Sequence, residues 1–196
     1  MTFKRIEVSS AEFPDITAYR DVVNICLDLA KRSGDTKEIS FFQQAKTVLN
    51  RDKLPVLEIA DYNTGGLRGP CVSGTPFHAL VKATGVSAKD LETSGGSFGI
   101  GKNAVYAASD LQTAFYSKVP EWLRRSVTGT SIFSIAMRDS LDWEAELIAS
   151  ILMNFFVAIH RKEMEFGVGS EVINSNTLLY KFDDPRISKA AERSGN

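Results

Sequence analysis

The sequence predicts an α/β protein, because some segments repeat apolar residues with the period of a strand and others with the period of a helix. Two amphipathic helix patterns lie near the start of the chain, a longer one lies beyond residue 140, and strand patterns alternate with them. The 196 residues are 43% hydrophobic and 24% charged, which is ordinary for a folded chain that can bury a sizeable core.

The first third of the chain is predicted to form a strand, two helices and a second strand. Asp15 lies where it could cap the first helix, and the second strand delivers Asp61 at its carboxyl end. The predicted elements are a strand over 3–8, helices over 16–31 and 36–50, and a buried strand over 54–60.

The middle of the chain is rich in loops, with nine glycines between residues 62 and 101. Such a long irregular stretch inside a compact domain is usually functional. The later elements are predicted as helices over 75–84, 102–110 and 143–161, and strands over 112–117, 131–137, 163–169 and 171–180. We expect a core over 1–137, a helix with closing strands over 138–182, and a polar, frayed tail over 183–196.

Charge and cysteine usage exclude several classes of protein. The net charge of −1 gives no bulk attraction for nucleic acid. Arg124-Arg125 and Arg161-Lys162 are interpreted as solvated surface charges, with nucleic-acid binding as an unsupported alternative. Cys26 and Cys71 fit neither a zinc site nor a redox pair. The chain start lacks a signal-peptide pattern, and the longest apolar run is short and interrupted, so we expect a soluble, cytoplasmic protein without a membrane span.

A glycine-rich run directly before a predicted helix favours phosphate binding. Closely spaced glycines let successive backbone N–H groups face one concavity, and a following helix adds its unpaired amides and dipole. The alternative is a tight structural turn. The lysine is not followed by Ser or Thr, so the run is no P-loop, and no strand precedes it directly, so it is no dinucleotide fingerprint. The run is Gly96, Ser97, Phe98, Gly99, Ile100, Gly101, Lys102 and Asn103.

Asp61 at its strand end could accept a hydrogen bond from an exocyclic amino group such as that of adenine. Gly65 and Gly66 would let a flat base approach the backbone, and Asn63 tolerates the left-handed conformation. The alternative is an Asn-Thr-Gly turn stabilised by the Asp61 side chain, and the residues alone favour neither interpretation. Thr130 opens a strand, where its hydroxyl could bond a base or a bridging water.

Together, these features resemble the GHKL ATPases, which include gyrase B, the large heat-shock chaperone, sensor histidine kinases and MutL. The residues of these motifs resemble still more closely those of uncharacterised prokaryotic GHKL-like ATP-binding proteins. The segments that carry the resemblance run from Ile59 to Leu67, from Gly96 to Ala104, from Gly129 to Phe133, from Glu146 to Ser150 and from Asn154 to Phe156.

The resemblance implies the Bergerat fold, an α/β two-layer sandwich with a mixed sheet and helices on one face. ATP would lie between the layers, with Mg²⁺, under a lid formed by about residues 67–98. Asp61 would recognise adenine, Gly65 would lie beside the base, and Thr130 would support the adenine contact. The phosphates would be held by Gly99, Gly101 and Lys102.

One feature of that family is missing. Its N box supplies a Glu as general base and an Asn that binds Mg²⁺, but no Glu-x-x-x-Asn pattern precedes Asp61. Glu146 and Asn154 are eight residues apart on a helix and do not replace it. The sequence therefore predicts ATP binding and leaves hydrolysis unassigned.

Two hypotheses follow. The chain is an ATP-driven conformational switch that acts as a homodimer or with a partner protein, in a prokaryotic system of the anti-phage defence type. Alternatively, it is a degenerate scaffold or interaction module that does not hydrolyse nucleotide.

Overall fold

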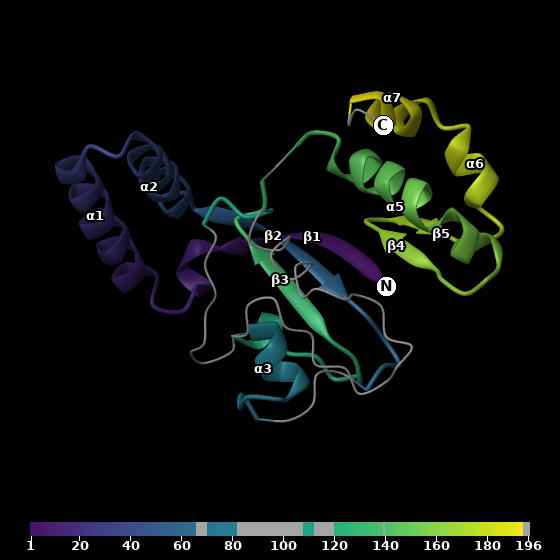
Figure 1. Ribbon diagram of the computed structural model, residues 1–196, viewed down its shortest axis with the longest axis horizontal. Coiled ribbons are helices and arrows are strands. Elements are labelled where there is room, and N and C mark those ends of the chain that lie inside the picture. Colours follow the sequence, from purple (N-terminus) through teal and green to yellow (C-terminus); the bar gives the residue numbers. More distant parts are fainter. Residues whose placement is uncertain (66–69, 82–107, 112–119, 139, 194–196) are drawn as a thin grey trace.

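The computed structural model of the protein describes residues 1–65, 70–81, 108–111, 120–138 and 140–193. Its strands form one open sheet in the order β3-β2-β1-β4-β5 (Figure 1). β1 pairs with β4 in parallel, and the other pairings are antiparallel. The strands are β1 (Thr2–Ser9), β2 (Lys53–Ala60), β3 (Ser131–Ile135), β4 (Phe166–Val168) and β5 (Glu171–Ile173). This mixed sheet with packed helices confirms the predicted α/β class and is consistent with a two-layer sandwich.

The register of the sheet decides which chain segments meet. β1 and β2 pair over their whole length, from Thr2 opposite Ala60 to Ser9 opposite Lys53. β2 and β3 pair so that Ala60 lies opposite Ser131. Because these two strands are antiparallel, the carboxyl end of β2 and the beginning of β3 lie at the same end of the sheet. Asp61 therefore lies beside Thr130.

Two helices pack near the carboxyl end of β1 and the amino end of β2 (Figure 1). The apolar periodicity of the sequence predicts both helices. They are α1 (Ile16–Ser33) and α2 (Thr36–Leu49). The buried side chains around them include Val8, Phe13, Val23, Ala45, Val48, Leu49, Leu54 and Val56. We call this set the N-terminal cluster.

The predicted cap of α1 is wrong in one respect. Asp15 occupies the N-cap position, but its φ of 51° is left-handed and its side chain accepts no capping hydrogen bond. A side-chain cap normally requires an extended backbone at that position. Asp35, whose backbone is extended, does cap α2 and accepts from the N–H groups of Lys37 and Glu38 at 2.9 and 3.1 Å.

A long helix lies over β4 and β5, and two shorter helices pack against it (Figure 1). They are α5 (Trp143–His160), α6 (Leu178–Phe182) and α7 (Pro185–Arg193). Their buried side chains, the C-terminal cluster, include Ile148, Leu152, Ile159, Phe166, Val168, Ile173, Leu178 and Ile187. Within the described residues, α5 is the one helix with the length and hydropathy of a membrane span, although a third of it is buried inside the molecule.

The central strand separates the two clusters. Ile6 packs against the N-terminal cluster and Val8 belongs to it, whereas Phe3 packs against the C-terminal cluster. The two clusters thus contact different residues of β1, and this strand connects them.

The end of the chain differs from its prediction. The strand expected over 171–180 ends at Ile173, because the Asn174 side chain accepts from the N–H groups of Asn176 and Thr177 at 3.0 and 3.2 Å and turns the chain into α6. The frayed tail is also wrong. Residues 185–193 form α7, with Ile187 and Ala190 buried one helical turn apart against the C-terminal cluster.

The middle of the chain contributes α3 (Pro76–Val81) and a short 3₁₀ helix, η2 (Glu121–Leu123). The strand predicted over 131–137 ends at Ile135, and Met137 forms an isolated bridge with Ser109. Residues 108–110, the end of a predicted helix, are a turn and this bridge instead. The rest of that helix and the strand predicted over 112–117 lie outside the described residues.

Candidate functional site

The predicted base-recognising residue, Asp61, is tied to the beginning of β3 by reciprocal hydrogen bonds. Its backbone N–H donates to the Thr130 carbonyl at 3.0 Å. Its carboxylate Oδ1 accepts from the Thr130 N–H at 2.5 Å and from the Thr64 hydroxyl at 3.0 Å. The structure therefore brings together two predicted site residues that are 69 positions apart.

The two carboxylate oxygens of Asp61 differ in their surroundings. Oδ1 carries both hydrogen bonds, while no other group in the described part of the chain donates to Oδ2. The bond from Thr64 shows that Asp61 does stabilise its own turn. This role occupies one oxygen, so the turn and ligand interpretations of Asp61 are compatible.

The turn after Asp61 is exposed and has the backbone expected of it. Asn63 has a φ of 60°, the left-handed conformation that its short polar side chain tolerates. Residues 62–65 are all exposed to solvent, and Gly65 is the last described residue before the gap at 66–69. A planar ligand could therefore reach this turn from the solvent side.

Arg125 is the site residue that sequence reasoning missed, because it was interpreted as a solvated charge. Its Nη2 donates to the Asp61 carbonyl at 2.6 Å and to the Thr128 carbonyl at 3.4 Å. Its Nε donates to the Val127 carbonyl at 3.0 Å, and its Nη1 to the Ser131 hydroxyl at 2.9 Å. Arg125 is partly buried and its neighbour Arg124 is exposed, so the two arginines differ in their surroundings.

Gly129 is required by the close approach of these groups. Its φ is 136°, which side chains rarely allow, and a Cβ placed there would lie 2.4 Å from the Asp61 carbonyl oxygen. The same atom would lie 2.7 Å from Nη2 of Arg125. The glycine of the Gly-Thr pair therefore makes room for the contact between the two segments.

The charges of the site are arranged around Arg125. Its guanidinium carbon lies 5.0 Å from the centre of the Tyr62 ring, a favourable cation–π distance. The Ser131 hydroxyl, which accepts from Arg125, donates to Glu58 on β2 at 3.4 Å. Among the described residues Arg125 forms no ion pair, so carbonyl dipoles and an aromatic face hold its charge.

The structure describes only some of the other predicted site residues. Thr130 contributes through its backbone groups, and no described residue bonds to its hydroxyl. Gly66 and the whole run from Gly96 to Asn103 lie outside the described residues. Of the lid expected over 67–98, the structure describes residues 70–81, which include α3.

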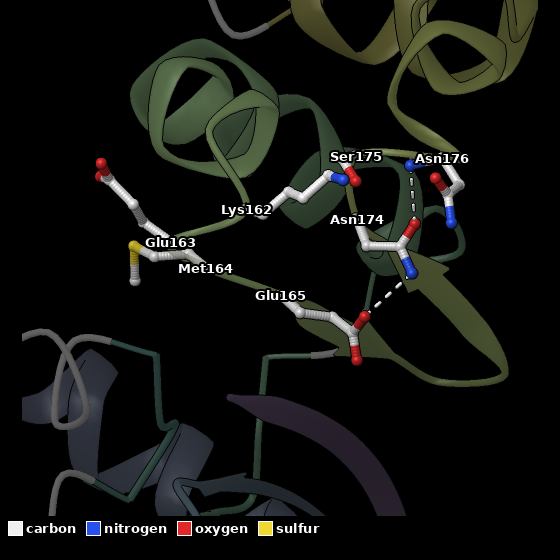
Figure 2. Close-up of a pocket in the computed structure, with 7 residues that line it drawn as sticks. All are labelled: Lys162, Glu163, Met164, Glu165, Asn174, Ser175 and Asn176. Carbon is white, nitrogen blue, oxygen red and sulfur yellow. Dashed lines mark hydrogen bonds between the residues drawn. The ribbon is translucent and has the colours of Figure 1, made fainter.

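A separate hollow of about 450 Å³ lies at the carboxyl end of α5, remote from Asp61 in sequence (Figure 2). The Asn174 amide donates to Glu165 at 2.9 Å, and Asn174 Oδ1 accepts from the Asn176 N–H at 3.0 Å. Lys162 and Glu163 line it with exposed side chains. Its Asn174 and Glu165 side chains thus bind the protein itself, and no ligand is assigned to it.

Comparison of the chain with protein-family models, with curated proteins and with solved structures finds no match. The geometry around Asp61 and the motifs of the sequence therefore carry the functional argument.

Proposed function

We propose that this protein binds an adenine nucleotide, and that the Asp61 carboxylate accepts a hydrogen bond from the amino group of the base. The observation that supports the proposal is that the two oxygens of that carboxylate differ in their hydrogen bonds. Oδ1 is held by the Thr130 N–H and the Thr64 hydroxyl, and Oδ2 has no donor within the described residues. An oriented acceptor beside an exposed turn suits a base that presents an exocyclic N–H.

Adenine fits such an acceptor better than guanine does. A carboxylate accepts hydrogen bonds only, so it favours the 6-amino group of adenine and disfavours the carbonyl oxygen at the equivalent position of guanine. A buried or partly buried polar group that loses its partner costs free energy, so the wrong base is penalised as well as unrewarded. We therefore expect selectivity for adenine.

The phosphate half of the proposal is based on sequence. The run from Gly96 to Lys102 has the glycine spacing and following helix pattern of an anion pocket, and Lys102 adds a positive charge. These residues and the resemblance point to ATP rather than to adenosine. Mg²⁺ would accompany the phosphates.

The biological role proposed is that of a nucleotide-driven switch. On the resemblance alone, ATP would change the conformation of the chain and favour a second copy or a partner protein in a prokaryotic defence system. The alternative is a scaffold that does not hydrolyse nucleotide. A Mg²⁺-dependent ATPase rate well above background in the purified protein would exclude this alternative.

Calorimetric titration with ATP and Mg²⁺ tests the binding proposal through Asp61→Asn. The Asn carbonyl keeps the acceptor for Thr130 and Thr64 but replaces Oδ2 with an N–H donor that faces the amino group of adenine. A hydrogen bond to a charged group contributes about 1.5–3 kcal/mol, so we expect affinity to fall by roughly 10- to 100-fold.

Asp21→Asn is the matched control, because it makes the same change at an exposed position of α1. It should bind ATP as the wild type does. Equal affinity of the wild type and Asp61→Asn would remove Asp61 from base recognition. Absence of ATP binding by the wild type would refute the proposed function.

A further inference from the structure

We propose that Arg125 is a positioning residue that orients the Asp61 carboxylate and thereby sets the selectivity of the site for adenine; the selectivity rests on the proposed function. The positioning itself is independent of any ligand. It depends on the hydrogen bonds that join the two segments of the site.

The main chain of Asp61 is held on both sides. Its N–H is held by the Thr130 carbonyl at 3.0 Å, and its carbonyl is held by Nη2 of Arg125 at 2.6 Å. Both ends of the residue are therefore fixed just beyond the end of β2. Thr130 supplies one of these bonds, directly beyond the last pair of the β2–β3 ladder, and Arg125 supplies the other.

The turn that faces Asp61 is held by the same arginine. Arg125 donates to the carbonyls of Val127 and Thr128 and to the hydroxyl of Ser131. One guanidinium therefore binds residues on both sides of the turn. Gly129 lies within this turn. The Thr130 N–H that follows is thereby directed at Asp61 Oδ1, at 2.5 Å.

The shape of the arginine side chain suits this position. A guanidinium presents several N–H donors in a fixed planar fork, which suits four acceptors around one plane and stacking on the Tyr62 ring. A lysine ammonium would keep the charge with three donors on a flexible stem. Since no described carboxylate pairs with Arg125, the arrangement depends on the fork rather than on charge neutralisation.

The consequence is specific. Without Arg125 the turn 127–131 loses its shared donor, the Thr130 N–H drifts from Oδ1, and the carboxylate rotates. The site then loses its preference for adenine. The contacts to the phosphates do not involve the base, and they remain.

The test uses Arg125→Ala and Arg125→Lys, with Arg124→Ala as the matched control at the exposed neighbouring arginine. The ligand-free readout is the amide proton resonance of Thr130 in ¹H–¹⁵N spectra, since a hydrogen bond to a carboxylate shifts an amide proton downfield. The second readout is the ratio of ATP to GTP affinity by calorimetry. Thermal melting checks folding, and Arg125→Lys serves if Arg125→Ala does not fold.

We expect both Arg125 variants to move the Thr130 resonance upfield and to reduce the ATP-to-GTP affinity ratio at least tenfold, while Arg124→Ala changes neither. An unmoved Thr130 resonance in the Arg125 variants would overturn the inference, whatever the nucleotide result. An equal loss of ATP and GTP affinity together with a lower melting temperature would also overturn it, because Arg125 would then act on stability alone. If the wild type binds no ATP but the Thr130 resonance moves, the proposed function and its selectivity fail, and the positioning of Asp61 is upheld.

Discussion

The two oxygens of the Asp61 carboxylate serve different purposes in this molecule. Oδ1 holds the turn through Thr64 and the beginning of β3 through Thr130, and Oδ2 faces no described donor. A side chain that is half structural is better oriented than one that is free, because its rotamer is already fixed before a ligand arrives. If the proposed function holds, this pre-organisation would let a single carboxylate discriminate between bases.

At the same scale, Gly129→Ala should disturb the site more than a glycine substitution elsewhere. The new methyl group would lie 2.4 Å from the Asp61 carbonyl oxygen at a φ of 136°. Backbone strain of this kind costs about 1–3 kcal/mol, and we expect the free energy of unfolding in urea to fall by at least that amount. The Thr130 amide resonance should move as well.

Gly74→Ala is the control for that substitution. Gly74 has a φ of 90° but nothing within 4 Å of an added Cβ, so it carries the conformational cost without the clash. We expect a loss of about 1 kcal/mol there and an unchanged Thr130 resonance. Equal effects of the two substitutions on the Thr130 resonance would show that the contact at Gly129 does not position Asp61.

At the scale of elements, α7 is held by few but well-placed apolar side chains. Ile187 and Ala190 are buried against the C-terminal cluster, whereas most of the helix is polar. Ile187→Ala should lower the free energy of unfolding by about 2–5 kcal/mol, the usual cost of removing a buried branched side chain. Lys189→Ala, on the exposed side of the same helix, should change it little. A small effect of Ile187→Ala would indicate that α7 is not docked in solution.

The carboxyl-terminal elements should also become less stable in acid. The side-chain hydrogen bond from Lys181 on α6 holds the pKa of Glu171 on β5 below its ordinary value, against a smaller opposing effect of burial, and Arg186 lowers it further. A lowered folded-state pKa contributes stability that is fully present above the unfolded pKa and is lost as the pH falls through the folded value. We therefore expect the loss to begin below about pH 4.3, the unperturbed pKa of Glu.

Urea denaturation of the wild type and Glu171→Gln between pH 6 and pH 3 checks this expectation. The stability advantage of the wild type should shrink as the pH falls, because the protonated Glu171 carboxyl is neutral, as is the glutamine amide that replaces it. Glu163→Gln, at an exposed position, is the control. A pH-independent difference between the wild type and Glu171→Gln would contradict the proposed linkage.

At the scale of the whole molecule, β1 joins two hydrophobic clusters unequally. It pairs with β2 at eight positions but with β4 only at Thr2 and Phe3. Each cluster also contacts one of the two tryptophans of the chain, Trp122 in the N-terminal cluster and Trp143 in the C-terminal one. The narrow connection through β4 should let the C-terminal cluster open by itself.

Single-tryptophan variants test this division. Trp122→Phe leaves Trp143 as the probe, and Trp143→Phe leaves Trp122. In the background of Ile187→Ala, the urea midpoint reported by Trp143 should fall while that reported by Trp122 stays nearly constant. Equal shifts of both midpoints would show that the clusters unfold as one cooperative unit.

The sequence by itself determined several of the local elements, and the chemistry that it predicts for the site stays a prediction. Periodicity predicted α1, α2, β2 and α5 closely, because each buries one face whose spacing is visible in the residues. Asn63 was predicted to tolerate a left-handed conformation, and it adopts one. Asp61 and Thr130 were selected as residue types suited to base recognition, although nothing in their spacing showed that they would touch.

Only the tertiary structure decided how these parts meet. The register of β2 with β3 brings Asp61 to Thr130. Arg125 joins Asp61 to the turn before Thr130 mostly through main-chain carbonyls, which no pattern of side chains in the sequence reveals. The end of the chain was misjudged for a related reason. Ile187 and Ala190 are too few to mark a helix within a polar stretch, and α7 is stabilised by the cluster it covers rather than by its own composition.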